Sequence, residues 1–270
     1  MKPLKLKTIL LPAMAAMLSA SCGSNKSAEQ QAAVTAPAPV AYFHADAATA
    51  GTLHGRVMYH GPRPTRQVVS MESDPACAKA AHGKKIYDDQ LLLSNDGGVG
   101  NVFVYIKAGL EDKKFETPAE SVVLDQSGCS FGPRVMGAQS KQVVLIRNSD
   151  PVEHNVHPMP KNNAAWNEGM EPGGPEMKHR FARPEIMIRI KCNVHGWMRA
   201  YLGVLDHPYF AVTGPDGSFD LKNVPPGNYM IGIWHEKLGE LAQPVTIAPS
   251  AAQTLNFQFD EKSAVAPLVN

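Results

Sequence analysis

The chain has 270 residues, of which 44% are hydrophobic and 19% are charged, and its formal net charge is +1. Without the three lysines of the extreme N-terminus (Lys2, Lys5 and Lys7), 23 of the 26 Lys and Arg residues remain against 25 Asp and Glu, a net charge of −2. This balance, with no run of basic residues, excludes nucleic acid as an expected partner. The length is enough for one large or two modest domains with a hydrophobic core.

Residues 1–22 have the features of an export signal. The three lysines precede a mostly apolar stretch, residues 8–18, which is too short to span a bilayer permanently. Small residues then lead to Cys22, an order that resembles a bacterial lipoprotein signal, although Ser19 stands where that pattern prefers Leu. We therefore expect a protein of the periplasm or cell envelope, anchored to a membrane by lipid on Cys22. Ordinary signal cleavage without a lipid is the alternative.

The rest of the chain divides into a linker and an all-β region. Residues 23–50 are rich in Ala, Ser, Gln and Pro, a composition that predicts a flexible linker. From residue 51 onward, short β-branched and aromatic runs alternate with turn residues, which predicts an all-β fold. The stretch Ser73 to Lys84 is expected to be a short helix or a loop, and no long amphipathic helix is present, which excludes doubly wound folds and helical bundles. The predicted strands are Leu53–Tyr59, Val102–Lys107, Ser121–Leu124, Gln142–Arg147, Glu185–Lys191, Tyr201–Val204, Gly217–Leu221, Asn228–Trp234 and Gln253–Phe259.

Two turn-and-strand pairs mark the C-terminal part. A DG-x-F strand within Gly214–Leu221 is followed by a PPG-x-Y strand within Val224–Ile231, with Pro and Gly setting both turns. This pair resembles the carboxypeptidase regulatory-like, or transthyretin-like, β-sandwich. The resemblance implies that residues 51–110 and 208–262 belong to this sandwich module. Residues 111–207 would be a separate domain, inserted into or interwoven with the sandwich, or else following it in the chain.

The residues that carry chemistry lie in two segments of the middle region. His154-Asn-Val-His157 is followed, 38 residues after His154, by Cys192-Asn-Val-His195-Gly-Trp-Met198. The second segment lies between two predicted strands, so one loop can place three side chains around a point. Two imidazoles, a thiolate and a thioether suit copper that cycles between Cu(I) and Cu(II). His157 is a weaker candidate because strand alternation turns it away from its neighbours.

These two motifs resemble the cupredoxin family of blue-copper proteins, in particular its amicyanin- and plastocyanin-like members. The resemblance covers roughly residues 120–205 and implies a Greek-key β-sandwich that holds one copper ion. It implies His154 and His195 as imidazole ligands, Cys192 as the thiolate and Met198 as the axial ligand. On their own, Met198 is also typical of core filling and His195 of a loop histidine, so the combination carries the prediction.

The same resemblance assigns roles around the ligands. Asn155 would join the two ligand loops and point its backbone N–H at the sulfur of Cys192, a contact that tunes the metal. In the family, the loop histidine reaches solvent within an apolar patch. Met159 and Trp197 are therefore expected to form the docking surface around His195, although both could equally cap the core.

The four cysteines are assigned together with these motifs. If Cys22 carries lipid and Cys192 binds metal, Cys77 and Cys129 remain as a pair in an oxidising compartment, where disulfides persist. We therefore predict a disulfide between them. Two separate buried thiols, or a second metal site formed by Cys77 and His82, are the alternatives.

The function expected from these features is that of an exported type 1 copper protein. It would transfer electrons between protein redox partners such as a cytochrome or a dehydrogenase. The sequence carries no G-x-S-x-G, HExxH or phosphate loop, and the ligand set has no open position, so an enzyme is not expected. A copper chaperone or store with the same donors, or a structural sandwich that binds partners, are the alternatives.

Overall fold

The computed structural model describes residues 40–81 and 84–263. The predicted export signal, the predicted lipidation site Cys22, most of the linker and His82 lie outside the described residues. Within those residues, no helix combines the length and the apolar character that a bilayer crossing requires.

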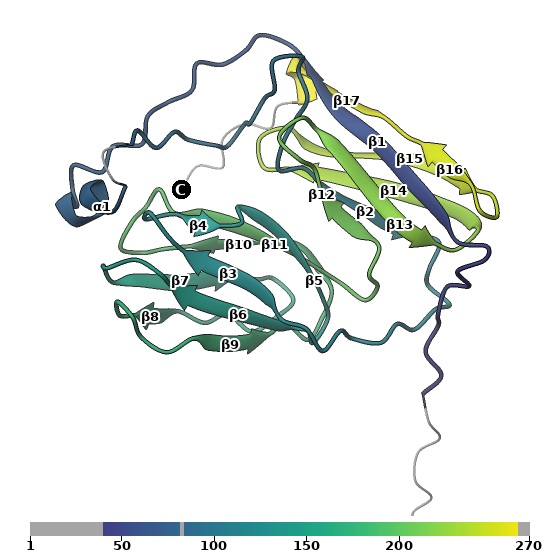
Figure 1. Cartoon of the computed structure of the whole chain (residues 1–270), viewed down its shortest axis with the longest axis horizontal. Coiled ribbons are helices and arrows are strands. Elements are labelled where there is room, and N and C mark those ends of the chain that lie inside the picture. Colours follow the sequence, from purple (N-terminus) through teal and green to yellow (C-terminus); the bar gives the residue numbers. More distant parts are fainter. Residues whose placement is uncertain (1–39, 82–83, 264–270) are drawn as a thin grey trace, which may run out of the picture. The chain divides into compact units, whose positions relative to one another are not determined.

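The fold class is all-β, as the turn-rich sequence predicts. Apart from strands, the described residues contain the short helix α1 (Pro75–Ala80) and a 3-10 turn at Glu261–Ser263. The strands form two sandwiches (Figure 1). We call them the middle sandwich, strands β3 to β11, and the flanking sandwich, strands β1, β2 and β12 to β17, after their order in the sequence.

The middle sandwich consists of two sheets, ordered β5-β11-β10-β7-β8 and β4-β3-β6-β9. Their facing side chains form one core, in which Leu124 and Ile146 of one sheet meet Val156 and Ile188 of the other. Alternation along strands such as β6, where every second residue is buried, builds this face. The strands are β3 (Val122–Gln126), β4 (Phe131–Gly132), β5 (Val135–Gln139), β6 (Val143–Asn148), β7 (His154–Met159), β8 (Glu168–Met170), β9 (Met177–Arg180), β10 (Glu185–Lys191) and β11 (Arg199–Leu205).

The flanking sandwich is built from both ends of the described chain. Strand β1 pairs with β13, β16 and β17, and strand β2 pairs with β12 and β14. The middle sandwich is therefore an insertion between β2 and β12. The strands are β1 (Gly51–His60), β2 (Phe103–Ala108), β12 (Phe210–Val212), β13 (Ser218–Val224), β14 (Gly227–His235), β15 (Gly239–Ile247), β16 (Ala252–Thr254) and β17 (Phe257–Asp260).

Two sequence predictions about these elements are wrong in part. The single strand expected over Gln253–Phe259 is two strands, because the backbone N–H of Leu255 donates to His54 and the pairing with β1 restarts afterwards. The linker expected over residues 23–50 is packed in its last part. There the ring of Phe43 lies 5.6 Å from that of Phe115, an apolar contact that the average composition conceals.

A long segment between β1 and β2, of which residues 61–81 and 84–97 are described, reaches the middle sandwich, and we call these described residues the lid. Its two ends meet, since the backbone N–H of Tyr59 donates to Gly97 at 2.8 Å. Between them the chain runs to α1 and back (Figure 1). Met71, Cys77 and Ala81 of the lid belong to the core of the middle sandwich, so the lid is part of that packing unit.

Candidate metal centre

The predicted ligands lie at the ends of two neighbouring strands. His154 begins β7, and Cys192 directly follows β10. These strands pair side by side in antiparallel register. The loop after Cys192 is closed by its own backbone, because Met198 donates to His195 at 2.9 Å and Cys192 donates to Met198 at 3.2 Å. Strand pairing and loop closure thus fix all four residues relative to each other.

Three of the four side chains converge on one buried point. The exposed fractions are 0% for His154, 2% for Cys192, 2% for His195 and 1% for Met198. The two Nδ1 atoms of the histidines are 2.9 Å apart, and the sulfur of Cys192 is 3.9 Å from Nδ1 of His195. One donor atom from each of His154, Cys192 and His195 lies within 4.8 Å of the others.

The distances suit a shared metal ion. Metal–nitrogen bonds of about 2.0 Å and a metal–sulfur bond of about 2.3 Å, as known for zinc, would separate ligand atoms by roughly 3 to 4 Å around a trigonal or tetrahedral ion. Met198 is buried in the same loop, where a thioether can serve as a weak axial ligand. The residues present therefore fit a copper ion held by two imidazoles, a thiolate and a thioether.

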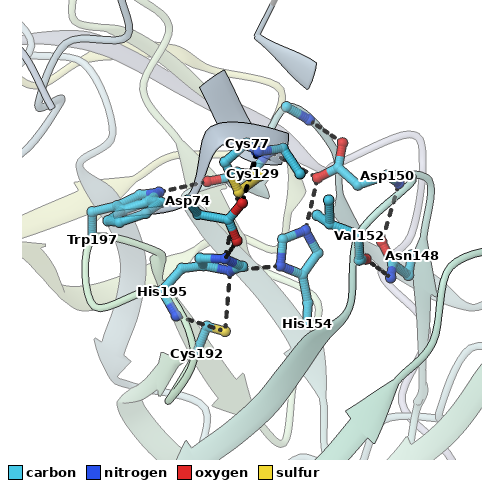
Figure 2. Close-up of a disulfide and its surroundings, with 12 residues drawn as sticks. Asp74, Cys77, Cys129, Asn148, Asp150, Val152, His154, Cys192, His195 and Trp197 are labelled. Atoms are coloured by element: carbon cyan, nitrogen blue, oxygen red, sulfur yellow. Dashed lines mark hydrogen bonds and ion pairs between the residues drawn. A yellow bond between two sulfur atoms is a disulfide. The ribbon is translucent and has the colours of Figure 1, made fainter. Parts of the chain in front are cut away.

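Both rings are turned toward that point by carboxylates on their far sides. Nε2 of His154 donates to Asp150 at 2.8 Å, and Nε2 of His195 donates to Asp74 at 2.8 Å (Figure 2). A carboxylate only accepts, so each ring carries its proton on Nε2 and turns Nδ1 toward the other ring. Two Nδ1 atoms at 2.9 Å then need a proton or a metal ion between them.

The carboxylate of Asp150 is fixed by further hydrogen bonds besides the one from His154. Its side chain is nearly inaccessible and accepts the backbone N–H groups of Gly128 at 2.6 Å and Cys129 at 2.7 Å. Burial alone would raise the pKa of Asp150, but the hydrogen bonds from His154 and from these two amides lower it. The carboxylate is therefore ionised and faces His154 with a fixed negative charge.

The surroundings favour the protonated form of His154 and the thiolate form of Cys192. Burial alone would lower the pKa of His154, but its interactions with Asp150 and Cys192 raise it to about 9. Burial alone would raise the pKa of Cys192, but its hydrogen bonds with His154 and with the backbone of Asn155, His195 and Val194 lower it to about 7. The site thus stabilises a thiolate, the form that binds metal.

Asn155 lies where the two ligand segments meet. Its backbone N–H is one of the groups that stabilise the Cys192 thiolate. Its side-chain oxygen accepts the backbone N–H of Asn193, the residue after Cys192. Asn155 therefore bonds to the second ligand loop at two points, in the positions that the sequence resemblance implies.

The expectation that His195 reaches solvent is wrong. The lid covers the ring, with Asp74 at Nε2 and the sulfur of Cys77 at 3.5 Å. Trp197, an expected docking residue, is half-buried, and its indole N–H donates to Cys129 at 3.0 Å. The sequence could not reveal this cover because Asp74 and His195 are 121 residues apart.

Two apolar residues close to the candidate ligands in the chain are exposed. Met159, the other expected docking residue, is 44% exposed at the end of β7, and Val194 is 54% exposed inside the ligand loop. His157 lies outside the metal cluster and contacts the side-chain oxygen of Asn193 at 3.3 Å. Its placement agrees with the strand alternation.

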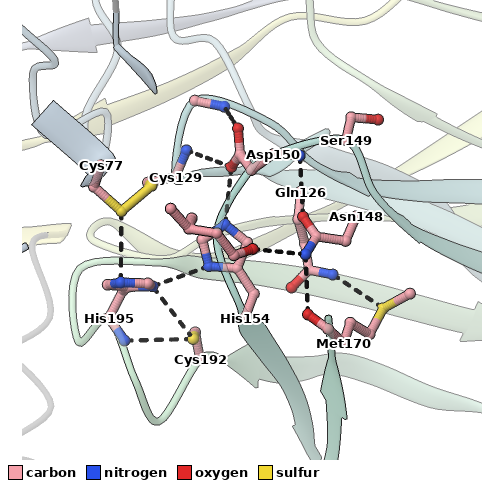
Figure 3. Close-up of polar contacts among 12 residues, drawn as sticks. Cys77, Gln126, Cys129, Asn148, Ser149, Asp150, His154, Met170, Cys192 and His195 are labelled. Carbon is pink, nitrogen blue, oxygen red and sulfur yellow. Dashed lines mark hydrogen bonds and ion pairs between the residues drawn. A yellow bond between two sulfur atoms is a disulfide. The ribbon is translucent and has the colours of Figure 1, made fainter. Parts of the chain in front are cut away.

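Cys77 and Cys129 form a disulfide, the pairing expected from the sequence. The bond joins α1 to the loop whose amides hold Asp150 (Figure 2). The Asn148 side chain stabilises the turn that follows β6, because it donates to the carbonyl of Val152 (Figure 2). It also donates to the carbonyl of Met170 (Figure 3). This turn presents Asp150 and His154 from one rigid segment.

Sequence reasoning missed two residues of the site, Asp74 and Asp150. A signal was present for each. Ser73-Asp74-Pro75 has the form of a helix N-cap, and Asp150 lies four residues before His154 in a polar turn. Neither signal indicates which histidine the carboxylate contacts.

No family model and no curated protein matches the chain. Among solved structures, a copper-containing nitrite reductase (NirK) from Thermus scotoductus SA-01 is 19% identical, with 37% of this chain and 25% of that chain covered and a TM-score of 0.30. The chain thus spans about a quarter of that reductase. A purple cupredoxin from Nitrosopumilus maritimus is 17% identical over 31% of this chain and 98% of that chain, with a TM-score of 0.27.

A reduced Cu(I) form of an amicyanin mutant is 19% identical over 37% of this chain and 97% of that chain, with a TM-score of 0.29. The similar structures named here are thus copper proteins or cupredoxins by their descriptions. Scores at this level do not assign a function to the chain. They give no support to the transthyretin-like interpretation of the flanking sandwich, which stays a prediction.

Proposed function

We propose that this protein binds one copper ion in the middle sandwich and transfers electrons. The ligands are Nδ1 of His154, Nδ1 of His195 and Sγ of Cys192, with Met198 as the axial ligand. The observation that carries the proposal is the approach of the two Nδ1 atoms to 2.9 Å beside a buried cysteine, with both Nε2 atoms already bonded. Such a geometry leaves three donors facing one point.

Copper held in this way supplies a centre that accepts and releases one electron. The chain supplies a scaffold that keeps the donors in place during that change. Two paired strands and a closed loop fix the ligands, and three backbone amides stabilise the thiolate of Cys192. A site that moves little between two redox states suits fast electron transfer.

Burial favours an electron carrier over a copper chaperone or store. A chaperone needs ligands that a partner can reach and replace, whereas all four candidate ligands here are at most 2% exposed. The lid adds a further cover over His195. Copper release would require the lid or the ligand loop to open.

The partner and the location belong to the same proposal. The export signal and Cys22 support a lipid-anchored protein of the periplasm or cell envelope. A soluble or membrane-bound redox protein, such as a cytochrome or a dehydrogenase, would exchange the electron. Met159 and Val194 are the exposed apolar residues that flank the ligands and support docking there.

The test is titration of the purified protein with Cu(II), followed by visible absorption and paramagnetic resonance. We expect one copper per chain, with an intense visible band from the thiolate–copper bond that ascorbate bleaches and reoxidation restores. The band is lost in Cys192→Ser and in His154→Gln. It persists in His157→Gln, a matched control that removes a histidine from the same strand.

Other outcomes would select the alternatives. A colourless protein that takes up only Cu(I) would favour a chaperone or store. A protein that binds no copper would leave a structural sandwich that binds partners.

A further inference from the structure

The two carboxylate oxygens of Asp74 accept hydrogen bonds from different parts of the chain. Its Oδ1 accepts the backbone N–H groups of Ala76 at 2.9 Å and Cys77 at 3.2 Å, which caps the start of α1. Its Oδ2 accepts the Nε2 proton of His195 at 2.8 Å. The cap fixes one oxygen, so the direction of the other toward the ring is also fixed.

The lid that carries Asp74 is bonded covalently to the rest of the site. Cys77, three residues after Asp74, forms the disulfide with Cys129. The backbone N–H of Cys129 donates to Asp150, which in turn holds His154. One disulfide thus links the carboxylates behind both histidines, as Figure 2 shows.

We propose that Asp74 is a positioning residue of the copper site, and that the Cys77–Cys129 disulfide holds it in register with His195. This inference rests on the proposed copper function. Asp74 keeps the proton of His195 on Nε2, so that Nδ1 presents its lone pair to the ion. It also prevents the ring from rotating in the loop.

The carboxylate also biases the two oxidation states. Asp74 and Asp150 place two negative charges behind the ligand set, in addition to the thiolate of Cys192. Each charge stabilises Cu(II) more than Cu(I), because the attraction grows with the charge of the ion. Loss of a partner behind a metal-binding histidine typically weakens metal binding about 10- to 100-fold.

The variant Asp74→Asn tests this inference while α1 keeps its cap, since Asn caps helices as well as Asp does. Two backbone N–H groups require the single oxygen of Asn at the Oδ1 position. The amide nitrogen then faces His195 and donates to Nε2, which moves the ring proton to Nδ1, where copper should bind. A second variant, Asp74→Ser, also caps the helix but is too short to reach the ring.

We expect both variants to bind Cu(II) about 10-fold more weakly than the wild type, with a smaller loss for Cu(I). Each tenfold change in the ratio of the two affinities raises the reduction potential by 59 mV. Nitrogen NMR of the copper-free protein gives a readout without metal. His195 should carry its proton on Nε2 in the wild type and on Nδ1 in Asp74→Asn.

Glu72→Gln is the matched control, because Glu72 is an exposed acid on the same lid, two residues from Asp74. It removes the same charge without touching His195, and its affinities should equal those of the wild type. Equal affinities and an unchanged His195 tautomer in Asp74→Asn would overturn the inference. Failure of the wild type to bind copper would instead refute the proposed function, so the two failures are distinguishable.

Discussion

The substitution Asp150→Asn probes the buried carboxylate that binds His154. The carboxylate accepts three N–H groups, from Gly128 at 2.6 Å, Cys129 at 2.7 Å and His154 at 2.8 Å. Asn has one oxygen, so it can keep the two bonds made by Oδ2 but turns a donor toward Gly128. Two bonds weaken from charged to neutral, and one is lost.

Each bond to a charged group is worth about 1.5 to 3 kcal/mol, against about 1 kcal/mol for a neutral one. For this site, one lost bond and two weakened bonds sum to about 2.5 to 7 kcal/mol of unfolding free energy, which overlaps the range for breaking a buried charged pair. Urea unfolding of the copper-free protein, followed by tryptophan fluorescence, measures it. Trp166 and Trp197 both report on the middle sandwich, because they pack against its core.

Asp125→Asn is the control for this measurement. Asp125 lies at the same end of the sheet, but its carboxylate accepts only from the exposed hydroxyl of Ser149 among the described contacts. Its loss should cost at most about 1 kcal/mol. If Asp150→Asn costs no more than this control and binds copper as tightly as the wild type, then Asp150 does not hold His154 in the way described.

Three further results are expected. Replacing Cys77 and Cys129 together with serine should lower the unfolding free energy by up to about 4 kcal/mol, the chain-entropy value for a closed loop of this length; equal urea midpoints before and after replacement would contradict this. In the copper-free protein, the raised pKa of His154 contributes stability that is complete below pH 6.5 and is lost as the pH rises through about 9. The lowered pKa of Cys192 contributes stability that is complete above pH 9 and is lost as the pH falls through about 7. The two trends oppose each other, so the urea midpoint should change little between these limits, and a steep slope would refute the pairing. Val194→Asp should slow electron exchange with a protein partner while leaving the copper spectrum intact, and an unchanged rate would exclude this side of the loop as the docking surface.

Local patterns in the sequence predicted the parts of the molecule that depend on neighbours in the chain. In the run Glu185–Lys191, three isoleucines alternate with Met187, Arg189 and Lys191, and the run is a strand with the bounds expected. The motif from Cys192 to Met198 places its ligands in one loop because that loop is short and closes on itself. Local geometry that is encoded within a few residues could thus be predicted from the sequence.

Features that depend on distant contacts could not be predicted. The cover over His195 comes from Asp74, in a lid that no periodic pattern marks. Strand β15 was also missed, because among the described strands it pairs with β14 alone, at the sheet edge, and carries Pro244 among alternating exposed residues. In both cases, tertiary pairing rather than local preference decides the structure.

The most direct test of the account is the position of copper in crystals of the loaded protein, located by anomalous diffraction at the copper edge. We expect one peak at bonding distance from Nδ1 of His154, Nδ1 of His195 and Sγ of Cys192, with both Nε2 atoms still bonded to Asp150 and Asp74. A peak on the Nε2 side of either ring, or one that does not contact Cys192, would contradict the proposed site.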